Sequence, residues 1–223
     1  MRAEYVQHWG DELTVVNAAR VSFDKESEWE EKVVDVVGGF RTEKVLSDRD
    51  KKLVRFLARE GHTSCFEHMG ATLRLKVPII IARQIQRHRT FSYNEISRRY
   101  VDSEPELFWP DKWRKRAENV KQGSSDEEVD FDADGYAKSA ALIALEVYDR
   151  LLEEGAAPEQ ARMILPQNMY TEFYMSGNLR AWAHFLKLRL EAGAQKEVRD
   201  IAEQVEKLLQ PLWPVSMKAL MEH

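Results

Sequence analysis

A strictly alternating segment in the middle of the chain constrains the fold more than any other feature. Between residues 71 and 77, apolar Leu73, Leu75 and Val77 alternate with polar Thr72, Arg74 and Lys76. A period of two is typical of a strand with one buried face. Pro78 ends the alternation and suits the first turn of a helix, expected over residues 79–88. The sequence therefore predicts a sheet in which one strand leads directly into a helix.

The remaining elements are expected to be mainly helical. Residues 4–9 predict a short strand, Asp11 a helix cap, and Ser47 the start of a helix that closes at Gly61. Further helices are expected over residues 11–20, 136–154, 158–165, 179–190 and 194–209. Because no internal repeat, heptad run or clean linker is present, the pattern favours the α+β class. We expect a single helix-rich domain, residues 1–223, around a small and mainly antiparallel sheet.

Two stretches are less regular. The sequence of residues 24–47 suits an inserted helix or hairpin. The sequence of residues 121–135 predicts an acidic, solvated loop. Asp130, Asp132 and Asp134 imitate the start of a calcium loop. Its twelfth position falls on Ala141, where a bidentate glutamate is needed, so calcium binding is not expected.

Composition excludes several classes of protein. The 223 residues are 43% hydrophobic, which is enough for a sizeable core, and the net charge of −5 does not favour nucleic acid as a partner. A single cysteine, Cys65, rules out an internal disulfide and suits a reducing compartment, for which we expect the cytoplasm. The opening residues lack an apolar signal core, and the longest apolar run, residues 77–82, is too short for a bilayer. No membrane association is expected.

Basic side chains crowd residues 83–99. Five arginines and one histidine lie there against one carboxylate, Glu95. Like charges in contact repel by about 1 kcal/mol in water, so such a cluster indicates an anionic guest, here a phosphate-bearing ligand. On the expected helix Gln84, Arg87 and His88 share a face. The alternative is a solvated helix surface, but glutamate partners are scarce.

The polar series after this helix is interpreted as a loop whose backbone N–H groups could meet phosphate. Its polar members are Ser92, Asn94, Glu95 and Ser97.

The motif Arg87-His88-Arg89, followed by seven residues and Ser97, closely resembles the RHR-x7-S signature of flavin-dependent thymidylate synthases. The similarity extends through Asn94, Glu95, Arg99 and Tyr100. It also includes residues 19–23, 61–68, 162–171 and 178–189, in order. Residues 24–44 and 123–135 look like insertions relative to compact members of that family.

This resemblance implies an enzyme that converts dUMP to dTMP by reductive methylation. The family takes the carbon from methylenetetrahydrofolate and the reducing equivalents from NADPH, with FAD carrying hydride and methylene. Family members are homotetramers whose FAD sites are shared between subunits. No G-x-G-x-x-G motif and no P-loop is present, so FAD would be held by another architecture.

The resemblance also implies which residues bind. The expected dUMP-binding residues are Gln84, Arg87, Glu95, Ser97, Arg98, Arg99, Arg162 and Arg189, with Arg98 acting through its backbone. The expected FAD-binding residues are Ser64, Arg87, His88, Arg89, Glu95, Asn178, Arg180 and His184, with Ser22 a weaker candidate.

Arg189 is the expected catalytic residue. By resemblance it lies against the uracil ring, where a fixed cation would favour ionisation at N3 and polarise the pyrimidine. The alternative is a helix-end arginine paired with Glu191. Neither Cys65 nor Ser97 is expected to act as a nucleophile, because the family's usual mechanism needs none.

A metal is not expected. His62, Cys65, Glu67 and His68 match no standard zinc spacing. His62 is either close to the redox centre or a satisfied histidine just beyond a helix end. The functional alternative for the whole chain is a non-catalytic nucleotide-binding or nucleic-acid-binding protein that uses the basic helix.

Overall fold

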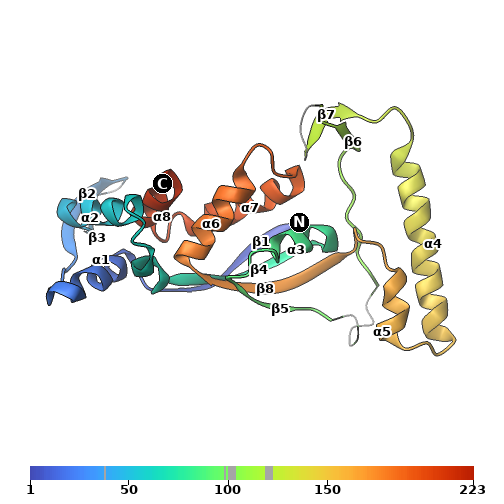
Figure 1. Ribbon diagram of the computed structural model, residues 1–223, viewed down its shortest axis with the longest axis horizontal. Coiled ribbons are helices and arrows are strands. Elements are labelled where there is room, and N and C mark those ends of the chain that lie inside the picture. Colours follow the sequence, from blue (N-terminus) through green and yellow to red (C-terminus); the bar gives the residue numbers. More distant parts are fainter. Residues whose placement is uncertain (38, 98, 100–103, 119–122) are drawn as a thin grey trace. The chain divides into compact units, whose positions relative to one another are not determined.

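The computed structural model describes residues 1–37, 39–97, 99, 104–118 and 123–223. A four-stranded sheet with the order β1-β4-β8-β5 consists of Arg2–Trp9, Gly70–Pro78, Tyr170–Asn178 and Ser92–Glu95 (Figure 1). Two smaller antiparallel sheets pair β2 (Glu30–Val36) with β3 (Gly39–Val45) and β6 (Arg114–Arg116) with β7 (Ser124–Glu128). The α+β class is therefore confirmed.

Helices supply most of the remaining structure. They are α1 (Glu12–Arg20), α2 (Asp48–Arg59), α3 (Ile79–Ile85), α4 (Ala133–Glu153), α5 (Pro158–Ala161), α6 (Leu179–Leu190), α7 (Lys196–Leu209) and α8 (Pro214–Glu222). Short 3-10 turns span Val21–Phe23, Thr63–Glu67 and Arg162–Ile164. Within the described residues, no helix combines the length and apolar character that crossing a bilayer requires.

The chain forms two compact units. Unit 1 comprises Met1–Ala3, Arg74–Met175 and Arg189–Ile201, and unit 2 comprises Glu4–Leu73, Ser176–Leu188 and Ala202–His223. Strands β4 and β8 contribute residues to both. The single-domain organisation expected for residues 1–223 stays a prediction.

In unit 2 a buried carboxylate joins the first helix to the last. Glu12, in the first turn of α1, accepts hydrogen bonds from the backbone N–H of Val215 (2.6 Å) and the hydroxyl of Ser216 (2.5 Å). These donors belong to the first turn of α8, where an anion satisfies otherwise unpaired N–H groups. Burial raises the pKa of Glu12 above its ordinary value even though these bonds oppose the shift.

Strands β4 and β8 approach each other closely in unit 2. A Cβ atom on Gly70 would lie 2.3 Å from the carbonyl oxygen of Gly177, so only glycine fits at position 70. Next to this contact the indole of Trp182, on α6, is fully buried and donates to the carbonyl of Ala71 at 3.1 Å. The helix is thereby fixed against the sheet.

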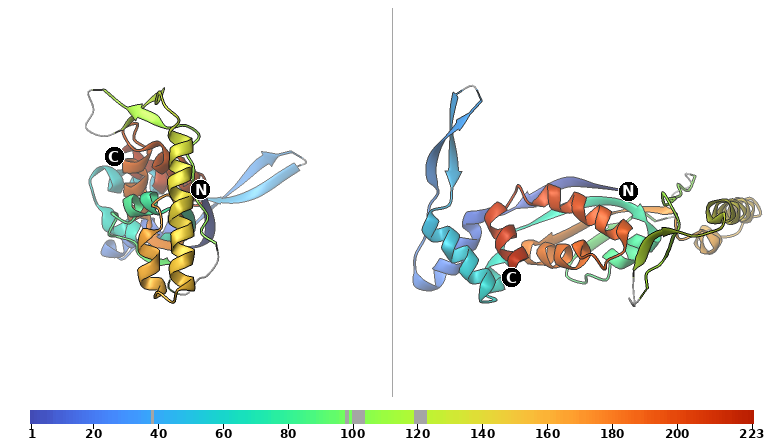
Figure 2. Two further views of the ribbon diagram at one scale, coloured as in Figure 1. Left: turned by 90° about the vertical axis from the view of Figure 1, so that its right-hand side faces the viewer. Right: turned by 90° about the horizontal axis from the view of Figure 1, so that it is seen from above.

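The irregular stretch after α1 is a hairpin, one of the two predicted alternatives. Strands β2 and β3 project from α1 and α2, as Figure 2 shows. An ionic cluster holds the base of this hairpin: Asp50 accepts from Arg20 (2.5 Å), Ser27 (3.1 Å) and Ser47 (2.8 Å). Beyond the cluster most hairpin side chains are exposed, including Phe40 at 79%.

In unit 1 helix α3 ends three residues earlier than the expected boundary at His88. The hydroxyl of Tyr93 lies 3.2 Å from the carbonyl oxygen of Ile85 and 2.9 Å from that of His88, so a side chain replaces the next helical turn. The expectation that Gln84, Arg87 and His88 share one helical face was therefore wrong. Gln84 lies on the helix, whereas Arg87 and His88 lie in the turn after it.

Two other sequence predictions need correction. The polar series at residues 92–97 was expected to be a loop, but residues 92–95 form β5. As an edge strand β5 tolerates exposed polar side chains, and Tyr93 packs against Phe173 with ring centroids 5.9 Å apart. Part of the acidic stretch 121–135 is also a strand, β7, which pairs with the basic β6. Elements β6, β8 and α8 were not predicted.

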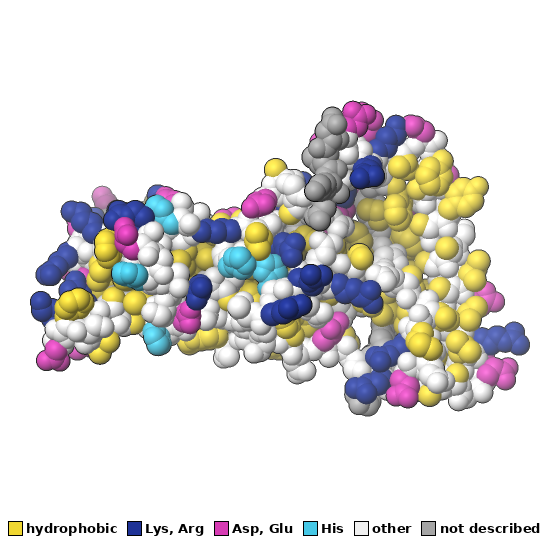
Figure 3. All heavy atoms as spheres, in the orientation of Figure 1, with side chains coloured by type: hydrophobic (Ala, Val, Ile, Leu, Met, Phe, Trp, Pro, Cys, Tyr) yellow, Lys and Arg dark blue, Asp and Glu magenta, His cyan; other side chains and the backbone are white. Residues whose placement is uncertain are grey.

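Helices α4 and α5 lie side by side in unit 1 (Figures 1 and 2). Ala141 and Tyr148 are buried on one side of α4, whereas Leu142, Ile143 and Val147 are 65, 61 and 44% exposed. Figure 3 shows hydrophobic side chains on the surface of the region that contains α4.

The β2–β3 hairpin is expected to contribute little to the stability of unit 2. Replacing residues 31–44 with Asn-Gly would join Glu30 to Val45, which already pair, and should change the free energy of unfolding by less than about 1 kcal/mol because a two-stranded hairpin with exposed side chains is marginally stable alone. Urea denaturation measures the difference. Asp50→Ala, which breaks the cluster at the hairpin base, should cost about 3 kcal/mol. An equally large loss from the deletion would contradict this prediction.

Candidate active site

Helix α3 and the turn after it carry the basic side chains of the 83–99 cluster. Apolar residues on one side of the helix are buried, which leaves Arg83 exposed and Gln84 half-buried. Beyond the helix end Arg87 and Arg89 are exposed, whereas His88 between them is only 6% exposed. Among the described residues, no carboxylate forms an ion pair with Arg87 or Arg89. Within the described ranges, two guanidinium groups are thus presented without a compensating carboxylate.

His88 is held in place by several hydrogen bonds. Its backbone N–H donates to Ile85 at 3.0 Å and its carbonyl accepts from Tyr93 at 2.9 Å. Burial raises the pKa of Tyr93 to about 12, so this hydroxyl remains a donor. The His88 Nε2 atom accepts from the Nε of Arg189 at 3.0 Å. Because a guanidinium can only donate, this bond requires a neutral imidazole with its proton on Nδ1.

Arg189, in the last turn of α6, is fixed by two acceptors. Besides His88, its Nη2 donates to the backbone carbonyl of Gln84 at 2.8 Å. These bonds, and not a contact with Glu191, orient its side chain. Burial, and secondly the charge of Arg87, lower the pKa of Arg189 from its ordinary value. A guanidinium remains protonated in proteins, so the site holds a half-buried cation beside a second one.

Arg189 lines a cavity of about 670 Å³ in unit 1, which we call the guanidinium cavity. Its walls are Gln84, Arg87, Arg114, Gly123, Ser124, Arg189, Gly193, Ala194 and Gln195. Three of these side chains are arginines and none is a carboxylate. The arrangement suits an anionic ligand that also offers groups for hydrogen bonding to an amide.

A buried ion pair closes one wall of the guanidinium cavity. The Nη2 of Arg114, on β6, donates to Glu197 at 2.6 Å, and the two side chains are 12 and 8% exposed. Burial alone would raise the pKa of Glu197, but the bonds from Arg114 and Gln195 outweigh it and lower the pKa below its ordinary value. The same arginine donates through Nε to Ser124 at 2.7 Å. The β6–β7 sheet is thereby attached to the start of α7.

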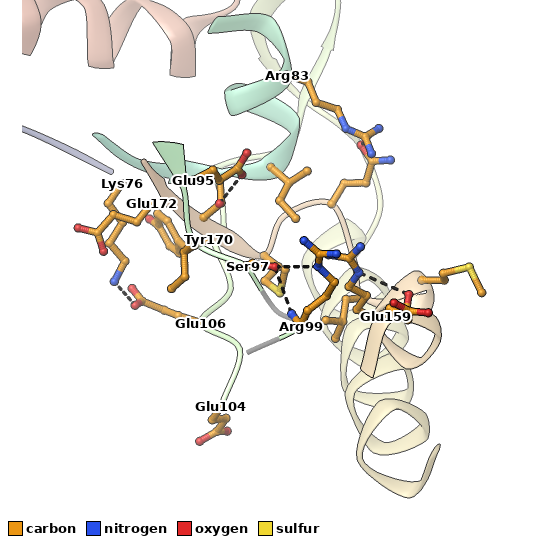
Figure 4. A pocket seen from close by; sticks show the side chains of 18 residues that line it. Lys76, Arg83, Glu95, Ser97, Arg99, Glu104, Glu106, Glu159, Tyr170 and Glu172 are labelled. Carbon is orange, nitrogen blue, oxygen red and sulfur yellow. Dashed lines mark hydrogen bonds and ion pairs between the residues drawn. The ribbon is translucent and has the colours of Figure 1, made fainter. Parts of the chain in front are cut away.

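A second cavity, of about 920 Å³, lies along β8 and the end of β5, and we call it the strand-edge cavity. Figure 4 shows Ser97 and Arg99 facing each other there, at 3.4 Å, with Glu95 above them. Glu95 accepts from Thr171 at 2.5 Å and from Gln86 at 3.0 Å. The other lining residues include Lys76, Arg83, Arg162, Glu104, Glu106, Glu159, Tyr170 and Glu172.

A third group of candidate residues lies in unit 2. Asn178 accepts from the backbone N–H of Ala181 at 2.9 Å and so caps α6. Two turns of that helix expose Arg180 and His184 on one face, and Arg180 forms an ion pair with Glu67 at 2.6 Å. Ser64 is exposed in the adjoining 3-10 turn of unit 2. This face offers a cation, an imidazole and hydroxyl or amide groups.

The described residues offer little support for nucleophilic or metal chemistry. Cys65 is buried, and burial raises the pKa of its thiol, which disfavours the reactive thiolate. Ser97 contacts Arg99, which cannot act as a base. No three His, Cys, Asp or Glu side chains of the described ranges come together as a metal site would require. His62 is exposed and packs edge-on against Phe56, with ring centroids 6.0 Å apart.

Comparison with known proteins identifies the family. Residues 4–215 match the family model described as thymidylate synthase complementing protein. A flavin-dependent thymidylate synthase of Thermus thermophilus is 38% identical over 218 residues, which are 98% of this chain and 74% of that protein. The chain belongs to the flavin-dependent thymidylate synthase family. The relative from Thermosipho africanus is 34% identical, over 97% of this chain and 89% of its own.

Solved structures agree with this membership. A UMP/dUMP methylase, PolB from Streptomyces cacaoi, bound with 5-Br dUMP, superimposes with a TM-score of 0.80 at 32% identity. The similarity covers 99% of this chain and 94% of that one. The resemblance based on the Arg87-His88-Arg89 motif is thus confirmed.

The residues implied by the family resemblance fall into three groups in this structure. Of the expected dUMP residues, Gln84, Arg87 and Arg189 line the guanidinium cavity, whereas Glu95, Ser97, Arg99 and Arg162 line the strand-edge cavity. Arg98 lies outside the described residues, as does Tyr100. Of the expected FAD residues, Arg87, His88, Arg89 and Glu95 belong to unit 1, and Ser64, Asn178, Arg180 and His184 to unit 2.

Sequence reasoning missed three residues of the guanidinium cavity and its wall. Arg114, Gln195 and Glu197 are joined by hydrogen bonds, although the first lies far from the other two along the chain. The available signals were a basic run at residues 112–116 and the polar residues 195–197 at the start of the helix predicted over residues 194–209. Neither signal indicates that the two segments meet.

Removing the buried arginine should make unit 1 less stable and less sensitive to acid. Arg114→Ala leaves the Glu197 carboxylate buried and unpaired, at a cost of about 3 to 5 kcal/mol in unfolding free energy. In the intact protein the lowered pKa of Glu197 stabilises the fold above the unfolded pKa of about 4.3, and this stabilisation is lost as pH falls through the folded value. The variant should lack that contribution.

Urea denaturation between about pH 3 and pH 7 measures both effects. Arg116→Ala, on the same strand with an exposed side chain, is the matched control and should change stability by less than about 0.5 kcal/mol. Equal losses from the two variants would refute the assigned role of Arg114.

Proposed function

We propose that the chain is a thymidylate synthase that methylates dUMP reductively to dTMP. Methylenetetrahydrofolate would supply the carbon, NADPH the reducing equivalents, and FAD would be the flavin. The observation that carries this proposal is the half-buried Arg189 cation, held by His88 and a backbone carbonyl beside Arg87. Family membership gives the reaction, and this geometry supplies a reason for it.

Arg189 would act on the pyrimidine. Its Nε and one Nη2 hydrogen are engaged by His88 and Gln84, so the remaining guanidinium edge is directed by fixed bonds. A cation oriented before the substrate arrives needs no reorganisation when negative charge develops on the ring. Partial burial strengthens that effect because the surroundings screen the charge less than water does. Arg189 is therefore the residue proposed to polarise uracil.

The two cavities suggest that a complete dUMP site uses two copies of the chain. They share no lining residue, yet the expected dUMP residues divide between them. Each cavity offers arginines that could hold a phosphate or a base, but neither contains the whole expected set. We propose that the guanidinium cavity of one subunit meets the strand-edge cavity of another in a homotetramer, as the family resemblance implies.

The residues proposed for FAD fit an anionic cofactor with a polar ring system. Arg87 and Arg89 lack ion pairs among the described residues, so a diphosphate could satisfy them. Asn178 and His184 offer hydrogen-bonding groups on α6, and Ser64 adds a hydroxyl. When bound, the flavin supplies hydride transfer. The chain's own residues would bind it, orient it and exclude water.

The alternative, a non-catalytic nucleotide-binding or nucleic-acid-binding protein, is not favoured. The net charge of −5 opposes long-range attraction of a polyanion, and arginines line two cavities that share no lining residue. A cytoplasmic location is proposed because the single free thiol suits a reducing compartment.

The purified protein should contain FAD and absorb in the visible range. NADPH should bleach that absorption, and oxidation of the reduced flavin with methylenetetrahydrofolate should depend on dUMP and yield dTMP. UMP should be tested in parallel, because the solved methylase similar to this chain is described as acting on both nucleotides. Protein that cannot be reconstituted with FAD, or that binds nucleotide without forming thymidylate, would overturn the proposal.

Arg189→Ala should retain flavin and lose thymidylate formation by about 100-fold or more, because it removes the preorganised charge at the ring. Anaerobic single-turnover assays with quantified dTMP measure the loss, and visible absorbance measures flavin content. Arg55→Ala, an exposed arginine of α2, is the control and should behave like the unaltered protein. Undiminished turnover by Arg189→Ala would exclude the role given to this residue.

A further inference from the structure

A chain of hydrogen bonds leads from the β6–β7 sheet to Gln84, one of the residues proposed to bind dUMP. The Gln84 Nε2 donates to the Oε1 of Gln195 at 2.5 Å, and the Gln195 Nε2 donates to the Oε2 of Glu197 at 2.8 Å. The other carboxylate oxygen of Glu197 accepts from Arg114 at 2.6 Å. All four residues belong to unit 1.

The orientation of each amide in this series of hydrogen bonds follows from the carboxylate of Glu197 at its end. An ionised carboxylate can only accept hydrogen bonds, so Gln195 must turn its NH2 group toward Glu197. Its carbonyl oxygen then faces Gln84, which in turn must present its NH2 group to Gln195. The Gln84 carbonyl oxygen is left as the atom that can accept from a ligand. The lowered pKa of Glu197 keeps the end of the chain ionised at neutral pH.

We propose that Arg114, Glu197 and Gln195 are positioning residues that make Gln84 present an acceptor, not a donor, to dUMP. The inference rests on the proposed binding of dUMP in the guanidinium cavity. The other hydrogen-bonding side chains that line the cavity are three arginines, whose guanidinium groups only donate, and Ser124 and Gln195. The oxygens of Ser124 and Gln195 already accept from Arg114 and Gln84. A single oriented acceptor among donors would recognise a hydrogen-bond donor of the nucleotide. A misoriented amide would place a donor against it.

Glu197→Gln should reverse the direction of the hydrogen bonds from residue 197 through Gln195 to Gln84. The oxygen of the new amide would accept from the charged Arg114, so its NH2 group would face Gln195. Gln195 would turn its carbonyl toward residue 197 and its NH2 group toward Gln84. The Gln84 carbonyl would then face Gln195, and its NH2 group would face the cavity. The change adds no bulk and removes no side chain, yet it reverses what the ligand meets.

The test is the dissociation constant of dUMP for the FAD-loaded enzyme, measured by calorimetry. Glu197→Gln should weaken dUMP binding by about 10-fold, because a donor replaces an acceptor at one buried contact. The KM for dUMP should rise with little change in kcat, and flavin content should be kept. Glu203→Gln, an exposed glutamate farther along α7, is the matched control and should leave dUMP affinity unchanged.

A double-mutant cycle with Gln84→Ala separates this role from a purely structural one. If Glu197 acts through Gln84, then Glu197→Gln should change dUMP affinity by less than about 2-fold once Gln84 is alanine. A general loss of structure would reduce dUMP affinity equally in both backgrounds, and that result would overturn the proposed positioning role. Failure of the unaltered enzyme to bind dUMP would instead overturn the proposed function.

Gln195→Leu provides a second route in case Glu197→Gln folds poorly. This variant keeps the Arg114–Glu197 ion pair and removes the amide that links Glu197 to Gln84. The Gln84 amide can then rotate. Affinity for dUMP should fall by about 3-fold, and again only while Gln84 is present. Unchanged dUMP affinity in Gln195→Leu would contradict the proposed positioning role.

Discussion

The site depends on holding cations close together. Arg189 is half-buried beside Arg87, and this proximity is unfavourable unless other groups offset it. Two neutral acceptors do so: the imidazole of His88 and the backbone carbonyl of Gln84. Neither acceptor neutralises the charge of Arg189, whereas a carboxylate would neutralise it. The arginine is therefore oriented while its positive potential remains available to an anion, which a conventional ion pair would have cancelled.

This arrangement explains why α3 must be short. The carbonyl of Ile85 faces the Tyr93 hydroxyl, and the turn that follows brings His88 under the end of α6. A longer helix would have kept His88 on the helical surface, where its ring could not reach Arg189 in the same way. The edge strand β5 is thus part of the site, because Tyr93 extends from it to hold the turn. The fold and the position of the cation are set by the same contacts.

Local patterns predicted most elements and the family resemblance implied the site residues, but neither indicated how distant segments meet. Alternation identified β4, capping signals identified α1 and α2, and the arginine cluster predicted a site for an anionic ligand. The turn at Arg87 was mistaken for helix because Tyr93, which ends the helix, is itself in a strand that looked like a loop. Arg114 and Glu197 were missed for a similar reason: an ion pair between residues 83 positions apart leaves no periodic signal.

The insertion-like segment that contains β7 is connected to the site and is not merely a surface addition. Its Ser124 accepts from Arg114, which pairs with Glu197 at the start of α7. Both side chains of that pair are almost fully buried, and burying charges is unfavourable unless each is well paired. Two apolar residues would pack there at less cost. The ion pair differs from an apolar contact in one respect: a carboxylate imposes an orientation on the amides bonded to it, and an apolar contact imposes none.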